Sequence, residues 1–220
     1  MPSDTTFIIN DTKVIKARIY GKKSTGGKIE CIIIKPLANN TFLALIRGKV
    51  KIDDIVEFDD GLSLQVKKLN GDGSREIVFF ENSEVLDFYG LLNKLDKIGH
   101  IPLPPYIHRE DNENDGVNYQ SSFAKNPGSV AAPTASLHFD TELLESLKRD
   151  FAFYPLTLHV GLGTFKSVEA DDIANHEMHS EYFQIPSESA QILDSTSKIL
   201  CIGTTATRTV EFYARTKKRE

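Results

Sequence analysis

The sequence is poor in several residue types, and each shortage narrows the class of protein. It has no tryptophan and only two cysteines, Cys31 and Cys201, which lie far apart in apolar segments. A disulfide-rich scaffold is therefore excluded, and we expect two buried free thiols in a reducing cytoplasm. No apolar run is long enough to cross a bilayer, and residues 1–10 lack the pattern of a signal peptide. We expect a cytoplasmic protein without membrane association.

An excess of positive charge is also missing, because the 220 residues carry a net charge of −5. The hydrophobic content of 40% and charged content of 26% are typical of a soluble globular protein. The total charge does not indicate a nucleic-acid-binding protein, but it does not exclude one, because a local basic patch is what binds phosphates. Basic residues are concentrated near both ends of the sequence: Lys13, Lys16, Arg18, Lys22, Lys23 and Lys28, then Arg208, Arg215, Lys217, Lys218 and Arg219. A solvated face and a frayed basic tail are the alternative explanation.

Short strands are predicted in the first part of the sequence. Six segments have mostly alternating apolar residues and are separated by Gly- and Asn-rich turns: residues 16–20, 28–34, 41–46, 54–58, 62–66 and 75–80. Six strands at this spacing favour a small closed β-barrel, since closure removes exposed sheet edges. We place this barrel domain at residues 14–81.

The pattern changes after residue 81. Apolar residues recur at helical spacing over 85–95, and Gly99 is expected to stop that helix. Further on, helices are predicted at 141–149 and 188–193, and strands at 156–160 and 180–185. A strand from Lys198 then passes through Gly203 into a helix, which is the unit of an open α/β sheet. Residues 1–13 and 82–220 are therefore predicted to form a Rossmann-like α/β domain with a mixed sheet. The whole chain is then an α+β/α/β two-domain protein whose α/β part has few strand–helix units.

The run from Pro127 to Phe139, PGSVAAPTASLHF, combines small residues with one proline and a histidine. A core strand would carry more branched side chains, and a helix would not tolerate Pro133 in its middle. The small residues let the backbone approach another group closely, while Ser129, Thr134 and His138 offer polar atoms. We expect a loop packed around a ligand.

A second candidate site is the glycine turn at Gly203, which leads into Thr204 and Thr205. A helix N-terminus at the end of a parallel strand offers N–H groups and partial positive charge to an anion. Arg208, one turn later, could close over a carboxylate or phosphate. The alternative is a structural turn in which one threonine caps the helix.

Histidines supply the remaining chemistry. The glycine-containing segment 157–165 lacks the lysine and the glycine spacing of a nucleotide-phosphate loop. A single histidine on an apolar strand, such as His159, is more often a core residue. His176 and His179, three residues apart, could share a helical face and bind zinc with Glu181. No cysteine pair or further acidic cluster completes such a site, so we favour acid–base catalysis or hydrogen bonding there.

Taken together, these motifs resemble the S-adenosylmethionine:tRNA ribosyltransferase-isomerase family of queuosine biosynthesis. The segments that carry the resemblance occur in the family's order and cover essentially the whole sequence: residues 10–14, 99–109, 119–120, 128–139, 157–165, 176–182 and 203–209. Ser136 stands where the family usually has glycine. The family's usual N-terminal segment and C-terminal portion are missing, so we expect the middle part of such an enzyme.

The resemblance implies transfer and isomerisation of the ribosyl group of S-adenosylmethionine. The acceptor is the aminomethyl group of 7-aminomethyl-7-deazaguanine in tRNA, and the product is epoxyqueuosine-tRNA with release of adenine and methionine. S-adenosylmethionine is then a co-substrate, and neither a bound cofactor nor a metal is expected. The implied partner is a tRNA with a GUN-type anticodon that carries the modified wobble base, bound by a monomer.

The resemblance and the residue chemistry together give three sets of candidate residues. The acid–base candidates are His138 and His179, followed by Glu181 and His159. The candidates for binding substrate are Arg109, Tyr119, Gln120, Pro133, Thr134, Thr164, Thr205 and Arg208. The candidates for contacting tRNA phosphates are Lys13, Arg18, Lys22 and Lys23.

Two other functions compete with this one. The first is a non-catalytic RNA-binding module built from the barrel and its neighbouring segment. The second is a metal-dependent hydrolase that uses His176, His179 and Glu181.

Overall fold

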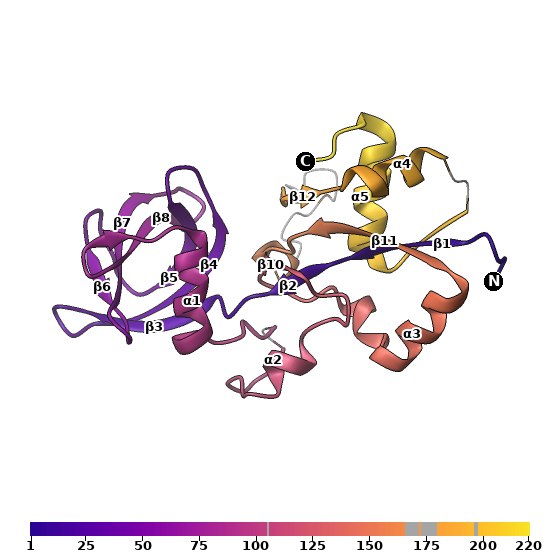
Figure 1. Cartoon of the computed structure of the whole chain (residues 1–220). Coiled ribbons are helices and arrows are strands. Elements are labelled where there is room, and N and C mark those ends of the chain that lie inside the picture. Colours follow the sequence, from indigo (N-terminus) through magenta and orange to yellow (C-terminus); the bar gives the residue numbers. More distant parts are fainter. Residues whose placement is uncertain (105, 166–171, 173–179, 196–197) are drawn as a thin grey trace. The chain divides into compact units, whose positions relative to one another are not determined.

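Six antiparallel strands close into a β-barrel, as the spacing of the apolar segments predicts (Figure 1). They are β3 (Arg18–Lys23), β4 (Lys28–Pro36), β5 (Thr41–Arg47), β6 (Ile55–Glu57), β7 (Leu62–Leu69) and β8 (Ser74–Glu81). Pairing of β5 with β8 closes the sheet, and β9 (Glu84–Val85) adds a short pairing to β8. Closure gives each of the six strands a hydrogen-bonded neighbour on both sides.

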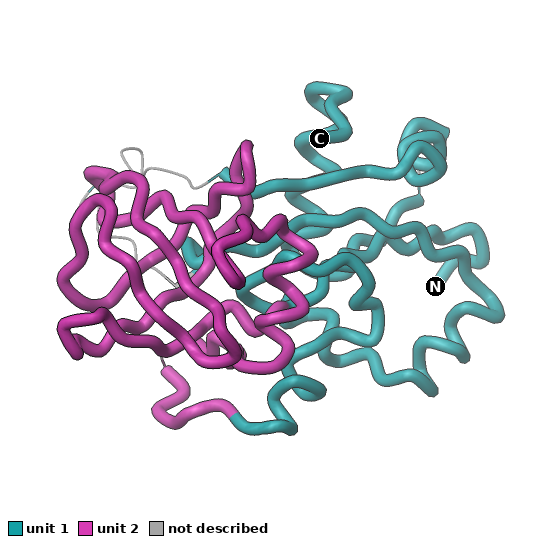
Figure 2. The backbone as a smooth tube through the Cα atoms, turned by 60° about the vertical axis from the view of Figure 1, so that its left-hand side comes forward, with its two compact units in different colours: residues 1–14, 112–220 teal, residues 15–111 magenta. Residues whose placement is uncertain are grey.

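The computed structural model describes all residues except 105, 166–171, 173–179 and 196–197. The described chain forms two compact units, residues 15–111 and residues 1–14 with 112–220 (Figure 2). The first unit contains the barrel and continues past residue 81, where the sequence-based domain ended. The barrel unit is therefore inserted into the other unit between residues 14 and 112.

The barrel core follows from the two-residue alternation of its strands. Ile19, Ile29 and Cys31 point inward and are almost completely buried, and Phe42 and Phe79 meet edge to face inside the barrel. The described cysteines are free, as expected; Cys201 is only half-buried, whereas the sequence suggested a buried thiol. Burial raises the pKa of the Cys31 thiol well above its ordinary value, so this residue stays neutral.

Helix α1 (Phe88–Ile98) belongs to the barrel unit. Asp87 caps it by accepting a hydrogen bond from the Gly90 N–H, and Leu91 and Leu95 form its buried face. The Lys94 side chain is also buried and pairs with Asp60 and Glu81, which raises its pKa. A buried ammonium with two carboxylate partners explains why a charged residue is tolerated on the apolar face.

The second unit is built on a mixed sheet with the strand order β12-β11-β1-β13 (Figure 1). Strands β1 (Thr6–Asn10), β11 (Ala152–Leu158) and β13 (Ile199–Cys201) are parallel, and β12 (Phe183–Gln184) is antiparallel to β11. The mixed sheet predicted for this part of the chain is thereby confirmed. The shortness of β12 and β13 leaves β1 and β11 as the main support of the sheet.

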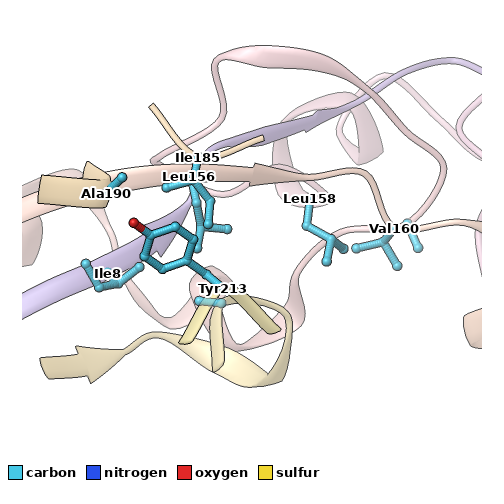
Figure 3. Close-up of a cluster of buried hydrophobic side chains, with 9 residues drawn as sticks. Ile8, Leu156, Leu158, Val160, Ile185, Ala190 and Tyr213 are labelled. Atoms are coloured by element: carbon cyan, nitrogen blue, oxygen red, sulfur yellow. The ribbon is translucent and has the colours of Figure 1, made fainter. Parts of the chain in front are cut away.

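Each face of this sheet has its own apolar core. On one face, Ile8 and Leu156 pack with residues of α4 (Ser187–Ser195) and α5 (Gly203–Thr216), including Tyr213 (Figure 3). On the other face, Phe7 and Ile9 pack with Leu144 of α3 (Thr141–Asp150) and with aromatic neighbours. The alternation of Phe7, Ile8 and Ile9 between the two cores explains why β1 reads as a continuous apolar run.

The segment from Pro127 to Phe139 is more ordered than the loop expected from its small residues. Asn126–Ser129 forms β10, which pairs in parallel with β2 (Thr12–Val14), and Thr134–His138 forms the 3₁₀ helix η1. The remaining short elements are α2 (Asp115–Asn118) and the 3₁₀ helix η2 (Leu162–Phe165). Small residues permit the parallel pairing because Gly128, with φ of +148°, bends the strand where the register shifts.

Among the described residues, none of the helices is both long enough and apolar enough to span a bilayer.

Candidate functional site

The parallel strands β1, β11 and β13 bring polar residues to one edge of the mixed sheet. Asn10 ends β1, His159 follows β11, and α5 begins at Gly203 just after β13. The carboxyl ends of parallel strands are where α/β sheets place their ligands. The residues that follow these strands therefore define the candidate site.

Asn10 connects three of the elements at this edge. Its buried side-chain amide donates to the Leu158 carbonyl at 3.0 Å and to Thr205 Oγ1 at 3.3 Å. Its side-chain oxygen accepts from the Leu158 N–H at 3.0 Å and from the Thr12 N–H at 3.2 Å. Asn10 thereby fixes the start of α5 and the start of β2 against the end of β11.

Asp11 is a buried carboxylate, only 5% exposed, held by neutral donors. The Thr157 hydroxyl donates to it at 2.6 Å, and the Asn126 amide donates to both of its oxygens at 3.1 and 3.0 Å. The Asp11 carbonyl also accepts from the N–H groups of Lys125 and Asn126. A buried polar group is costly unless it is hydrogen-bonded, and these donors compensate for the burial of the Asp11 side chain.

His159 lies beside this carboxylate. Its Nδ1 is 2.7 Å from Thr12 Oγ1, and its ring stacks on Tyr182 with centroids 5.5 Å apart. A Cβ atom at position 128 would lie 2.7 Å from its Nε2, so only glycine fits there. Burial lowers the pKa of His159 below its usual value, and the nearby charge of Asp11 opposes that shift. The imidazole is therefore neutral near pH 7, the state that a general base requires.

The lowered pKa of His159 predicts that stability depends on pH. The unfolded chain takes up a proton at this side chain near pH 6.5, whereas the folded chain resists protonation until its lower pKa is reached. Stability contributed by this group is thus present above about pH 6.5 and lost as the pH falls through the folded pKa. We expect the free energy of unfolding in urea to fall less between pH 7.5 and 5.5 for His159→Gln than for the unchanged protein.

The matched control for that titration is His108→Gln, because His108 is an exposed histidine of the other unit. An equal fall in the free energy of unfolding for both variants would contradict a lowered pKa at His159.

Glu181 and Arg208 join the same edge. Glu181 accepts from the Gly161 N–H at 3.0 Å, and its other oxygen is 3.1 Å from Nη1 of Arg208. Arg208 lies on α5 and reaches across to Glu181, which precedes β12. The pair therefore connects the first turns of α5 to the segment after β11. Thr205, Arg208, Glu181 and His159, all of them sequence-based candidates, are brought together here.

The small-residue segment lies against the same edge. The Val160 N–H donates to Ser129 Oγ at 2.9 Å, and the Ser129 hydroxyl donates to the Ala131 carbonyl at 2.7 Å. A Cβ atom at Gly203 would be 3.0 Å from Cβ of Ala135, so η1 packs on the start of α5. Pro133 is buried, while Thr134 and His138 are exposed. These three candidates lie on one short segment beside α5.

The alternative interpretation of this motif, a structural turn in which a threonine caps α5, is not what the structure shows. The helix begins at Gly203 after Ile202, without a hydrogen bond from a capping side chain. Thr204 and Thr205 lie inside the first turn, and Thr205 Oγ1 instead accepts from Asn10. Glycine is favoured at the first position of this helix because the backbone φ is +84° there and a Cβ atom would lie close to the side chain of Ala135.

Other sequence-based candidates lie elsewhere. Thr164 is exposed on η2, and Gln120 exchanges hydrogen bonds with both backbone groups of Val14, at 3.0 and 2.6 Å. Tyr119 is half-buried beside it, whereas Arg109 belongs to the barrel unit. His176 and His179 lie outside the described residues, so two of the three proposed metal ligands of the hydrolase alternative are not described. Within the described part of the chain, no group of three or more histidines, cysteines or carboxylates is placed to hold a metal.

The four basic candidates differ in what they contact. Lys13 is exposed on β2, and Lys22 is exposed on β3. Arg18 and Lys23 are half-buried in ion pairs, the first with Glu30 at 3.3 Å and the second with Asp54 at 2.7 Å.

Sequence reasoning gave no role to the residues that organise the site. Asn10 is the last residue of β1, Asp11 and Thr12 come directly after it, and Asn126 precedes the small-residue segment. The available signal was the abrupt change from a buried apolar strand to three consecutive polar residues. A strand end with that pattern is where an α/β sheet meets its ligand.

Comparison with known proteins shows the family of this chain. The model of a family described as queuosine biosynthesis protein matches residues 1–220, the whole chain. The chain belongs to this family. Two relatives are named S-adenosylmethionine:tRNA ribosyltransferase-isomerase. The one from Campylobacter jejuni strain RM1221 is 57% identical over 213 residues, which are 96% of this chain and 62% of the relative. The one from Aliarcobacter butzleri is 53% identical over 218 residues, covering 99% of this chain and 64% of the relative.

The chain thus spans less than two thirds of the length of these relatives in the family. Among solved structures, the crystal structure of S-adenosylmethionine tRNA ribosyltransferase from Thermotoga maritima is 25% identical with a TM-score of 0.35. That match covers 99% of this chain and 58% of the other.

Proposed function

We propose that this protein transfers and isomerises the ribosyl group of S-adenosylmethionine onto the aminomethyl group of 7-aminomethyl-7-deazaguanine in tRNA. The products are epoxyqueuosine-tRNA, adenine and methionine. The observation that carries the proposal is the family match over all 220 residues, together with relatives above 50% identity that are named for this reaction. The placement of a partly buried neutral histidine at the carboxyl edge of the sheet supports it.

The chemistry assigns a role to that histidine. The positive sulfonium acidifies the neighbouring ribose carbon, so a base can remove a proton there and open the sugar with loss of adenine. A base must be unprotonated at the working pH, and the lowered pKa of His159 meets that condition. We therefore place His159 first among the acid–base candidates, with His138 and Glu181 as candidates for protonating the leaving adenine. His179 remains a candidate on the grounds of sequence alone.

The start of α5 is proposed to bind the anionic end of the co-substrate. Its first N–H groups lack a capping side chain, and Thr205 and Arg208 lie in its first two turns. A helix N-terminus with a nearby guanidinium suits a carboxylate such as that of the methionine part. Thr134 on η1 is exposed beside this position and is proposed to contact the ribose or adenine.

The remaining features follow from the same proposal. S-adenosylmethionine serves as a co-substrate, and no resident cofactor or metal is invoked. We propose that the tRNA has a GUN-type anticodon, that the protein acts as a monomer, and that it works in the cytoplasm. The two free cysteines agree with a reducing compartment.

The direct test is release of adenine. The chain is incubated with S-adenosylmethionine labelled in the adenine ring and with tRNA carrying the aminomethyl base; free adenine and the modified nucleoside are then measured. We expect equal amounts of the two products, and no adenine with the same tRNA carrying guanine instead. The Campylobacter jejuni relative serves as the positive control.

Absence of adenine release under conditions where that relative is active would overturn the proposal for this chain. Adenine release that stops on chelation and returns with zinc would favour the metal-dependent alternative instead.

A further inference from the structure

Exposed cations gather on the outside of the barrel at the tip of the β3–β4 hairpin and at the end of β5. Together with a neighbouring tyrosine they are here called the hairpin patch, which consists of Tyr20, Lys22, Lys28, Arg47 and Lys49. Burial alternates along both strands, with Ile19 and Ile29 inward and Tyr20, Lys22 and Lys28 outward. The patch therefore faces solvent while its strands remain anchored in the core. It stands in contrast to the net charge of −5 of the whole chain.

Two members of the patch face each other directly. Lys22 on β3 is paired in register with Lys28 on β4, and both side chains are exposed. Like charges directly opposite each other destabilise a strand pair. In the described residues, neither lysine forms an ion pair within 4 Å that would relieve the repulsion. An anion bound between them would do so.

The other cations are held beside this pair by contacts from the neighbouring loop. Lys23 donates to the Lys49 carbonyl at 3.2 Å, and a Cβ atom at Gly48 would be 3.2 Å from the Lys28 carbonyl. The residues after β5 therefore lie along the hairpin. The side chain of Arg47 is 89% exposed and forms a long ion pair of 3.7 Å with Glu30. Glu30 also pairs with Arg18, at 3.3 Å.

The patch also borders a hollow and an exposed aromatic ring. The hollow has a volume of about 880 Å³. Its lining includes Ile29, Phe58, the carboxylates Glu30, Glu57 and Asp59, and all members of the patch except Lys49. Tyr20 is 47% exposed, and its ring is held edge to face with His100 at 5.3 Å. Glu57 on β6 is paired in register with Lys22, and Asp59 follows β6, so these two carboxylates lie on the β6 side of the hollow, whereas Lys28 and Arg47 belong to β4 and β5.

We propose that the hairpin patch is an RNA-binding surface, in which Lys22, Lys28, Arg47 and Lys49 contact phosphates and an unpaired base stacks on Tyr20. Single-stranded nucleic acid is bound by such a combination of a cationic track and an aromatic ring. An acidic peptide would use the cations but would have no use for the exposed ring. The inference rests on the proposed function, since tRNA is the RNA meant. It leaves out Arg18 and Lys23, whose side chains are half-buried in ion pairs with Glu30 and Asp54, and it includes Arg47, which is 89% exposed although it also pairs with Glu30.

The test is binding of fluorescently labelled tRNA by this chain, measured by anisotropy over a range of salt concentrations. For Lys22→Gln/Lys28→Gln we expect about tenfold weaker binding at low salt and a salt slope smaller by about two, because two phosphate contacts are lost. The matched control is Lys35→Gln/Lys67→Gln, which removes the same charge from exposed positions elsewhere on the barrel.

A second pair of variants tests the stacking. Tyr20→Ala is expected to weaken binding of a single-stranded oligonucleotide about tenfold with an unchanged salt slope, since stacking involves no counterion release. Tyr89→Ala is the control, because Tyr89 is an exposed tyrosine on α1 of the same unit. Thermal unfolding of each variant shows whether the barrel is intact, and only variants with an unchanged melting temperature are compared. A variant whose melting temperature falls is replaced by one in which the charge of Lys49 is reversed.

Equal binding by the patch variants and their controls would overturn the inference, and so would a patch that prefers a poly-glutamate peptide to RNA. Adenine release by the unchanged chain separates this outcome from failure of the proposed function. Release without patch-dependent binding refutes the patch alone, whereas patch-dependent binding without release refutes the proposed reaction alone.

Discussion

Replacing His159 by alanine is expected to lower the rate of adenine release by about a hundredfold or more, the usual cost of losing a general base. The expectation follows from the surroundings of the imidazole. Its Nδ1 is fixed by Thr12 at 2.7 Å, its ring is stacked on Tyr182, and its lowered pKa keeps it neutral. Single-turnover rates with saturating S-adenosylmethionine and tRNA measure the effect without interference from product release.

Two further histidine variants make this result decisive. His108→Ala removes an exposed histidine of the barrel unit and should leave the rate unchanged. His138→Ala removes the exposed histidine of η1. If His159→Ala retained a rate within about threefold of the unchanged protein while His138→Ala lost it, the base would be His138. A pH profile adds a readout, since loss of the base should remove the acidic limb of the rate.

The second large effect is expected for Asp11→Ala, which should lower the free energy of unfolding by about 3 kcal/mol. The substitution leaves the Thr157 hydroxyl and the Asn126 amide without their shared acceptor in a buried position. Hydrogen bonds to a charged group contribute about 1.5–3 kcal/mol, and a buried donor without a partner costs about 1–3 kcal/mol. Urea denaturation followed by circular dichroism measures the change.

The control for this substitution is Asp96→Ala, which removes an exposed carboxylate from the helix α1. It should change the free energy of unfolding by no more than about 0.5 kcal/mol. A similar small change for Asp11→Ala would mean that water enters and satisfies the two donors, and the buried network would then not be a stabilising element of the site.

The sequence was sufficient to predict the barrel because its strands mostly alternate between buried apolar and more exposed residues, as with the inward side chains of Ile19, Ile29 and Leu64. The parallel sheet was harder to predict, since β1 is buried on both faces and has no alternation. The motif Gly203-Thr204-Thr205 correctly located a strand-to-helix turn, but the helix start and its cap depend on how closely Ala135 packs on Gly203, which no local pattern shows.

The candidate site was predictable only in part for the same reason. His159, Glu181, Thr205 and Arg208 were recognisable by their chemistry. The contacts that make them a group run between residues far apart in the sequence, such as Asn10 with Thr205 and Asp11 with Thr157. Polar residues at strand ends have many possible partners in a sequence, and the register of the sheet decides among them.

The insertion of the barrel between β1 and the rest of its sheet has a consequence for the order of folding. Phe7 pairs in register with Phe153 and Leu200, so β1 has no partner until the ribosome has passed the whole of the barrel and α3. The barrel is continuous in sequence and forms from neighbouring strands, whereas the sheet must close a loop of more than a hundred residues. We expect the barrel to fold first during synthesis, while the apolar strand Phe7–Ile9 stays exposed and open to chaperones.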